Sequence, residues 1–309
     1  MTRPADDLAW PELELANWRP TRDTLHLWTQ VVGKVRLALS PPQNHWWHVP
    51  LYVTTRGLTT GPMPYGERSV GVMFDFIRHQ LVIFCSDGAE VLRRLEPMSV
   101  AAFYAMTLKA LAEVGVQVRI WPVPVELPDP VPFADDHAHA AYDRIYAQRF
   151  WRALVSSERV MTAFRGRFVG KSSPTHFFWG SFDLAGTRFS GREAPPHPGV
   201  PIMPDFITRD AYSHEVVSSG FWPGGDGLED PIFYTYAYPT PDGFAEAAVL
   251  PTEASWNAAF GEFVLPYAAV RAAADPAAAL TAFLQTTYAT GADALGWDRA
   301  ALERRDAPA

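Results

Sequence analysis

The sequence predicts an α+β protein made of two related halves, each an α-β-β-β-α unit with a mainly antiparallel sheet and helices on one face. Two observations support this. The aromatic segment 171–192 matches segment 40–58 at an offset of 131 positions, which aligns His45 with His176. In addition, a predicted helix precedes each copy, and predicted strands and a second helix follow it. We interpret the match as an internal duplication.

Residues typical of helix interiors and helix ends mark the elements of the first half. Leu25, Trp28 and Val32 recur at helical spacing before Ser40-Pro41, and Pro97 and Gly115 mark the two ends of another helix. Alternating apolar residues indicate strands between these helices. The first half is therefore predicted to contain a helix over 21–39, a strand over 44–56, a hairpin of 69–76 with 81–85, a helix over 97–114 and an edge strand over 116–125.

Three prolines within 127–132 indicate a stiff boundary, which gives halves at 1–128 and 129–309. The second half carries a Pro/Gly-rich insert at 192–230 that the first half lacks. We expect one compact unit with a pseudo-twofold axis, the halves joined edge to edge or face to face. The second half is predicted to contain a helix over 135–168, the aromatic strand, strands over 212–218, 232–238 and 244–250, and a last helix over 275–288.

Composition limits the function classes. The 309 residues are 48% hydrophobic and 19% charged, with a net charge of −8 and no run of basic residues, which argues against nucleic acid and anionic membranes as partners. No apolar run approaches the roughly 20 residues of a spanning helix. The N-terminal residues lack the apolar core of a secretory signal, and Cys85 is a single cysteine. We therefore expect a cytoplasmic protein.

Side chains alternate between the two faces of a strand, and this suggests where a site lies. In the second copy one face is apolar, and the other is mixed, with Trp179, Ser181 and Asp183. In the first copy the mixed face carries His48 and Tyr52. Ligand sites are mostly apolar with a few placed polar groups, so the mixed face predicts either an aromatic-rich pocket or a solvated sheet surface.

Three segments resemble a known family. NHWWHVPLYVTTRGL, SPTHFFWGSFDLAGTRFSGR and YSHEVVSSGFWPG together are similar to an uncharacterised bacterial family that is known only as a domain of unknown function. The resemblance extends over nearly the full chain. It implies a single unit, and it brings no activity, cofactor or catalytic residue.

The candidate catalytic residues are Asp183, His214, His48 and Glu215, because a histidine beside carboxylates suits proton transfer. His214 and Glu215 are neighbours on a strand, so only one of them can face the site. His45 and His176 either bond backbone groups or serve the site. The same His and carboxylate types could ligate a divalent metal, but HExxH and CxxC are absent and no metal ligand is predicted.

The candidate substrate-binding residues share an aromatic or polar character, and they are Trp179, Ser181, Trp222, Tyr52 and Arg192. Trp222 lies in a glycine-flanked loop, as lid residues often do. Arg192 could hold an acidic group. The alternating tyrosines 234, 236 and 238 are interpreted as cross-strand packing.

These residues favour an enzyme that uses acid/base groups on a small apolar or aromatic molecule. Neither GxGxxG nor a phosphate-binding loop occurs, so no organic cofactor is predicted. The alternatives are a small-molecule binding or sensor module without turnover, a metal-dependent enzyme, and an assembly protein whose aromatic face contacts a partner. The oligomeric state stays open.

Overall fold

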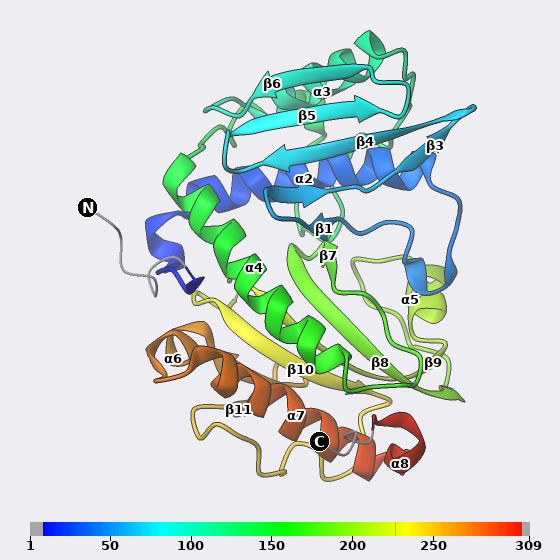
Figure 1. Ribbon diagram of the computed structural model, residues 1–309, viewed down its shortest axis with the longest axis vertical. Coiled ribbons are helices and arrows are strands. Elements are labelled where there is room, and N and C mark those ends of the chain that lie inside the picture. The colour runs from blue at the N-terminus through cyan, green and yellow to red at the C-terminus, as the bar shows by residue number, and fades with distance from the viewer. Residues whose placement is uncertain (1–8, 226, 305–309) are drawn as a thin grey trace.

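A computed structural model describes residues 9–225 and 227–304. Within these ranges, two six-stranded sheets follow one another along the chain, and every strand pairing is antiparallel. Figure 1 shows the first sheet at one end of the molecule and the second at the other, with long helices across both. This confirms the predicted α+β class with antiparallel sheets.

The first sheet has the strand order β1-β2-β4-β5-β6, with β3 paired to β4. Its helix α2 (Arg19–Leu39) packs against α3 (Val100–Glu113), whose N-cap is Ser99. Trp28 of α2 stacks on Phe103 of α3 with ring centroids 4.5 Å apart. The strands are β1 (Tyr52–Val53), β2 (Gly57–Thr59), β3 (Met63–Tyr65), β4 (Arg68–Asp75), β5 (Gln80–Cys85) and β6 (Glu90–Arg94).

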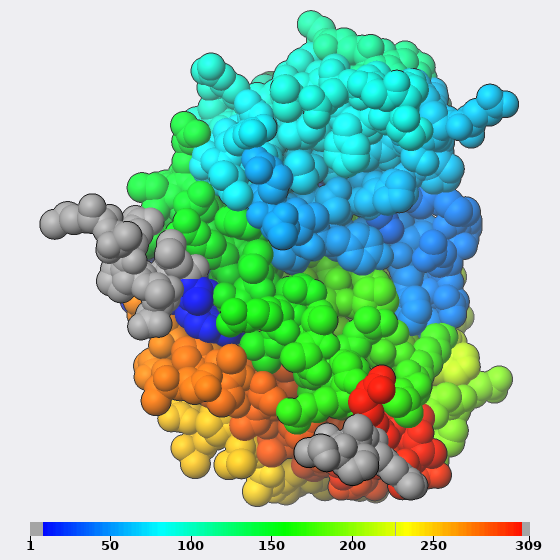
Figure 2. All heavy atoms as spheres, viewed as in Figure 1, coloured from blue at the N-terminus to red at the C-terminus, as the bar shows by residue number. Residues whose placement is uncertain are grey.

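The second sheet has the order β11-β12-β10-β9-β8-β7. Helices α4 (Arg144–Arg165) and α7 (Pro276–Ala294) cover one face, and on the side viewed in Figure 2 their side chains form much of the surface. The strands are β7 (His176–Phe178), β8 (Asp183–Glu193), β9 (His214–Trp222), β10 (Ile232–Tyr238), β11 (Ser255–Asn257) and β12 (Glu262–Pro266). The shorter helices are η1 (Leu15–Asn17), η2 (Asn44–Trp46), η3 (Phe133–Asp135), α5 (Asp205–Ala211), α6 (Tyr267–Ala272) and α8 (Arg299–Leu302).

The two sheets meet at a backbone bridge between Leu51 and Phe177. Each N–H donates to the carbonyl of the other residue at 2.8 Å. One hydrophobic core runs past this bridge, and it joins Trp28 in the first half to Phe150 and Phe283 in the second. The internal duplication and its pseudo-twofold axis stay predictions.

Both copies of the aromatic motif were wrongly predicted to be continuous strands. Segment 44–56 contains the short helix η2 and only the two-residue strand β1, because His45 and Trp46 have left-handed φ values of 56° and 61°. Segment 171–192 is a hairpin whose turn, 179–182, places Phe182 at φ 62°. These turns break the alternation on which the predicted faces depend.

Other boundaries also differ from the prediction. Helix α4 starts at Arg144, where Asp143 caps it, and it runs through Ser156 and Ser157 without a break. Segments 116–125 and 244–250 form no strand, and β10 pairs instead with the unpredicted β12. Pro122 and Pro124 lie in the first segment, and Pro251 directly follows the second. Proline has no N–H to donate, and this weakens strand pairing there.

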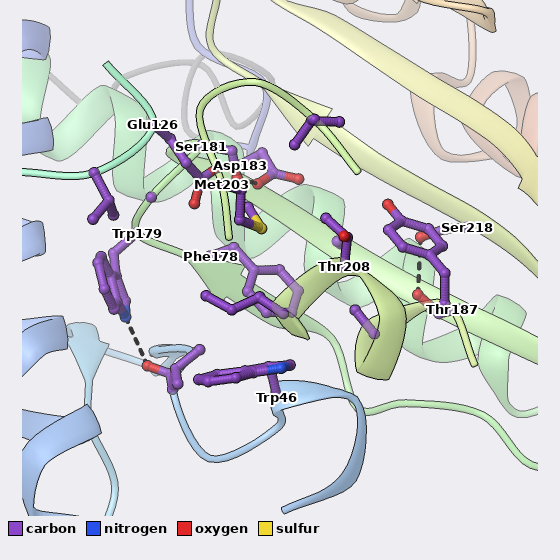
Figure 3. Close-up of a pocket in the computed structure, with 18 of the residues that line it drawn as sticks. Trp46, Glu126, Phe178, Trp179, Ser181, Asp183, Thr187, Met203, Thr208 and Ser218 are labelled. Carbon is purple, nitrogen blue, oxygen red and sulfur yellow. Dashed lines mark hydrogen bonds between the residues drawn. The ribbon is translucent and has the colours of Figure 1, made fainter. Parts of the chain in front are cut away.

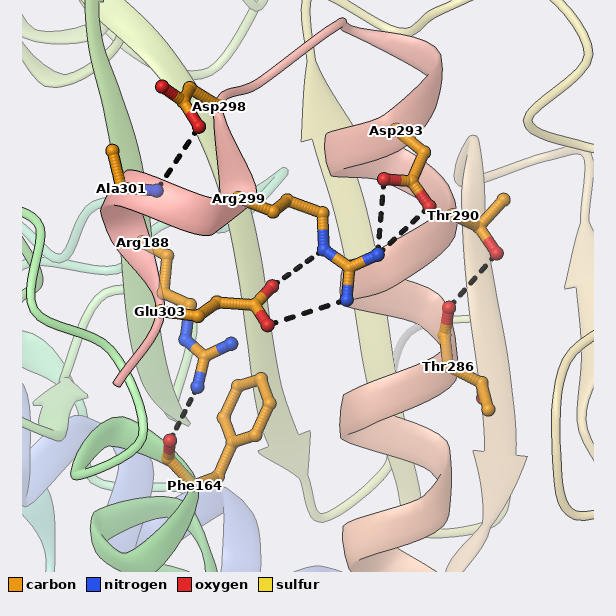
Figure 4. A network of polar contacts seen from close by, with 9 residues as sticks. All are labelled: Phe164, Arg188, Thr286, Thr290, Asp293, Asp298, Arg299, Ala301 and Glu303. Carbon is orange, nitrogen blue, oxygen red and sulfur yellow. Dashed lines mark hydrogen bonds and ion pairs between the residues drawn. The ribbon is translucent and has the colours of Figure 1, made fainter. Parts of the chain in front are cut away.

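A buried cation of the second sheet lies next to the polar contacts of helix α8 (Figure 4). The Arg188 guanidinium lies 3.4 Å from the centroid of the Phe164 ring and 4.2 Å from that of Tyr288, and it donates to the Phe164 carbonyl. Next to it, Arg299 pairs with Glu303 at 2.6 Å and with Asp293 at 3.0 Å. The Arg299 contacts fix residues 299–303 against α7, and the Arg188 contacts join β8 to α4 and α7.

Candidate functional site

A cavity of about 670 Å³ lies on the face of the second sheet that α4 and α7 leave uncovered. Strand alternation decides which residues reach it: Asp183, Ala185 and Thr187 of β8 line the cavity, whereas Arg188 on the other face contacts Phe164 of α4. The volume is within the usual range for small-molecule sites, about 300–1,000 Å³.

Segments outside the second sheet complete the cavity, among them the pair Val125 and Glu126 after α3. Helix α2 contributes Arg22, His26 and Lys34, which fall within one face at helical spacing. The turn around η2 contributes His45, Trp46, Trp47 and Val49, and segment 197–212, which includes α5, closes the opposite side. The turn and α5 are joined by His45, whose Nδ1 lies 3.2 Å from the carbonyl oxygens of Asp210 and Ala211.

Most of the lining is apolar. Figure 3 shows Trp46 on one side of the cavity and Asp183 with Ser181 and Met203 on the other, with Phe178 between them. The remaining apolar lining includes Leu37, Trp47, Val49, Phe189, Val200, Ile202, Ile207, Ala211 and Val216. The arrangement suits a molecule that is apolar over most of its surface and polar at one end.

Asp183 is the best-defined polar group of the cavity. Its carboxylate is buried and accepts hydrogen bonds from the Ser181 and Tyr234 hydroxyls. Tyr234 reaches it from β10 across β9, where Gly220 leaves room: a Cβ at Gly220 would overlap the Tyr234 ring and the Leu184 carbonyl. Burial raises the pKa of Asp183, and the two hydroxyls partly oppose this increase.

A second polar chain begins beside Tyr234. The Tyr234 ring lies parallel to the Tyr236 ring, and the Tyr236 hydroxyl is 2.9 Å from the Tyr212 hydroxyl. Tyr212 in turn stacks on His197 with centroids 4.7 Å apart. Burial raises the pKa of all three tyrosines, so their hydroxyls stay protonated.

Three more ionisable groups line the cavity. Burial, reinforced by the negative charge of Asp183, raises the pKa of both Glu126 and Glu262 to about 7. Burial lowers the pKa of Lys34 to about 8, although Glu126 favours its charged form. At neutral pH each of these groups therefore exchanges protons readily, which is typical of acid/base sites. Among the residues described here, no three His, Cys, Asp or Glu side chains are arranged to hold a metal ion.

Four of the nine candidate residues line this cavity: Asp183, Ser181, Trp179 and Trp222. Trp179 packs on Gly33 of α2, and its Nε1 donates to the Val49 carbonyl at 2.7 Å. It thereby fixes the turn around η2 against the first helix.

The other five candidates lie outside the lining. His48 accepts a hydrogen bond from the Gln43 N–H at 3.1 Å, and Tyr52 packs under the Arg36 guanidinium. The Arg192 Nη2 is 2.7 Å from a Glu215 carboxylate oxygen, which also accepts from Trp297 Nε1 at 3.0 Å. His214 contacts Ser213 and the edge of the His45 ring. The structure does not bring these five groups to Asp183.

Several lining residues were not predicted from the sequence. Tyr234 and Tyr236 were assigned to cross-strand packing, although their alternation gave the right strand face. Glu126 and Lys34 come from the first half of the chain, and no local pattern connects them with Asp183. The position of Lys34 between Val32 and Val35 of a predicted helix was the one available signal, because lysine is seldom buried without a partner.

Comparison with known proteins gives the family. A family model described as a family of unknown function (DUF5996) matches residues 10–304. The chain therefore belongs to this family, in agreement with the resemblance of the three aromatic segments. No curated protein and no solved structure matches the chain. Within the described residues, no helix has both the length and the apolar character needed to cross a membrane.

Proposed function

We propose that this protein is an enzyme that transfers protons to or from a small, largely apolar or aromatic molecule, without an organic cofactor. Asp183 is the central acid/base group in this proposal. The observation that carries it is a buried carboxylate, held by two hydroxyls, in the wall of an apolar cavity of ligand size. We also propose that the protein works in the cytoplasm.

The surroundings of Asp183 support a role as general base. Burial shifts the pKa of Asp183 towards neutrality. A general base is most effective there, because its carboxylate form is still populated and is also more basic than that of an ordinary aspartate. Ser181 and Tyr234 fix the orientation of the carboxylate. When Asp183 takes a proton, both hydroxyls can turn their hydrogen bonds towards negative charge on the substrate.

A proton donor is available in the same cavity. Glu126 and Glu262, with pKa values of about 7, are partly protonated at neutral pH. Pairs of groups whose environments separate their pKa values are the usual basis of acid/base division of labour. Trp179, Trp222 and the Trp46 side of the cavity supply the apolar surface that orients the substrate.

The test compares wild-type protein with Asp183→Asn and with Asp242→Asn, an exposed carboxylate in a turn. Each is incubated in D₂O with a defined mixture of small aromatic and aliphatic metabolites, and mass spectrometry follows depletion and deuterium incorporation. We expect compounds that change with the wild type and Asp242→Asn but at least about 100-fold more slowly with Asp183→Asn. Equal rates for the wild type and Asp183→Asn reject the assignment.

Native mass spectrometry of the same samples separates the alternatives. A compound retained by the wild type but never converted supports a binding or sensor module. An oligomer without retained compounds supports an assembly protein, and a retained metal ion supports a metal-dependent enzyme.

A further inference from the structure

The chain contains three lysines, Lys34, Lys109 and Lys171, and they differ sharply in environment. Lys109 and Lys171 are exposed, whereas Lys34 is only 3% exposed and lines the cavity. Burial of a lysine normally requires a partner, because the ammonium group loses its water.

Lys34 has no such partner at bonding distance. In the part of the chain that the structure describes, its Nζ makes neither a hydrogen bond nor an ion pair, and it lies 5.7 Å from the centroid of the Trp179 ring. Glu126 favours the charged amine by long-range attraction, but burial outweighs this effect and lowers the pKa to about 8. A neutral amine with a free lone pair is the nucleophilic form of lysine.

We propose that Lys34 is a nucleophile of this cavity and forms an imine with the carbonyl carbon of a small, largely apolar aldehyde or ketone. The proposal concerns the cavity of the proposed function, but it does not depend on proton transfer by Asp183. Glu126 is the group placed to assist, because it interacts electrostatically with both Lys34 and Asp183.

The reaction balances without an external oxidant or reductant. The Nζ lone pair attacks the carbonyl carbon, a proton passes from the nitrogen to the carbonyl oxygen, and a carbinolamine results. A protonated carboxyl group, here Glu126, then donates a proton to the hydroxyl, which leaves as water while the nitrogen lone pair forms the C=N bond. The resulting iminium nitrogen returns its proton to the Glu126 carboxylate, which leaves the neutral imine. Hydrolysis reverses the sequence. The apolar lining excludes bulk water and so favours the imine.

Benzaldehyde with sodium cyanoborohydride at pH 7.5 tests the proposal on the full-length protein. The hydride reduces the imine carbon, so each labelled amine gains one benzyl group in place of a hydrogen. A pKa of about 8 leaves roughly a quarter of Lys34 neutral at this pH, against roughly one part in a thousand for an ordinary lysine. Peptide mapping should find label at Lys34 at least about 10-fold above Lys109 and Lys171.

The controls separate this inference from the proposed function. Lys34→Arg keeps the charge but cannot form the imine, so cavity labelling should vanish while circular dichroism and unfolding confirm the fold. Denaturation in urea should abolish the preference for Lys34. Label on the N-terminal α-amino group is counted separately, because it lies on a different peptide from the three lysines. Asp183→Asn should retain labelling even if its turnover is lost. Equal labelling of the three lysines in the folded protein, or label unchanged in Lys34→Arg, would overturn the proposal.

Discussion

The Tyr234 hydroxyl donates a hydrogen bond to the Asp183 carboxylate across an intervening strand. The two residues belong to β10 and β8, and β9 runs between them with glycine at the crossing point, Gly220. Any larger residue there would separate donor from acceptor. The polar end of the cavity therefore depends on three strands at once.

Loss of the Tyr234 hydroxyl should weaken the protein mainly when Asp183 is ionised. A hydrogen bond to a charged group contributes about 1.5–3 kcal/mol, so Tyr234→Phe should lower the free energy of unfolding by roughly that amount at pH 8. The loss should shrink at pH 5, because burial raises the pKa of Asp183 and favours its neutral form. Urea unfolding at the two pH values measures the difference.

Tyr238→Phe is the matched control, because Tyr238 lies on the same strand and donates to the Pro195 carbonyl at an exposed position. We expect it to cost less than about 1 kcal/mol at either pH. Equal losses in the two variants would contradict a special contact between Tyr234 and Asp183.

Replacement of Gly33 by alanine should destabilise the folded protein, although the same change at most helical glycines is stabilising. Alanine normally favours a helix interior over glycine by about 1 kcal/mol. At Gly33, however, a Cβ would overlap the Trp179 indole. Gly33→Ala should therefore lower the free energy of unfolding by about 1–3 kcal/mol, as overpacked core substitutions do. Thermal or urea unfolding measures this change.

The double variant Gly33→Ala with Trp179→Phe provides the internal check. The smaller ring leaves room for the new methyl group, so the two changes should be less destabilising together than the sum of the single variants. Simple additivity would show that the indole can move away without cost.

The stability of the protein should fall steeply only below about pH 4.5. Burial lowers the pKa of His26 and His176 to about 3, so the unfolded chain binds protons at these residues from about pH 6.5 downward while the folded chain does not. Each such group costs up to about 1.4 kcal/mol per pH unit. Between pH 4.5 and 6.5, Glu126 and Glu262 act in the opposite sense, because their raised pKa values make the folded state bind protons.

Burial also lowers the pKa of His45, His48, His79 and His197, which adds to the histidine effect, and raises that of Asp183, which adds to the carboxyl effect. The two effects oppose each other in that window, and below it the histidine effect dominates. Urea unfolding between pH 7.5 and pH 3.5 should show a plateau followed by a decline. His176→Phe should flatten the decline, whereas His137→Phe, at an exposed position, should not. An identical decline in the two variants would assign the acid sensitivity to other groups.

The buried Arg188 should tolerate methionine better than lysine. The guanidinium stacks on Phe164 and Tyr288 and donates to a backbone carbonyl, and a lysine ammonium cannot stack in this way. Arg188→Lys should cost about 2–4 kcal/mol, because it leaves a poorly solvated charge in the core. Arg188→Met fills a similar volume without charge and should cost less. A scan of melting temperatures checks the order, and a more stable lysine variant would contradict it.

The sequence by itself determined the local and periodic features of this protein. Apolar spacing predicted α2, and proline and glycine at helix ends predicted α3 and α7. Alternation predicted the β4–β5 hairpin and β10, and the order of the predicted helices and strands gave the α+β class. These predictions agree with the structure because each depends only on residues that are close together in the chain. Asp183, Ser181 and Trp179 were also selected from one aromatic segment, and all three line the cavity.

Only the tertiary structure decided what surrounds Asp183. Left-handed turns at His45 and Phe182 redirected two expected strands, and long-range packing brought Lys34, Glu126 and Tyr234 to one cavity. The same packing turned Arg192 and Glu215 towards each other instead. No local pattern records such contacts, because they connect residues of different elements, and their pKa shifts arise from burial that exists only after folding.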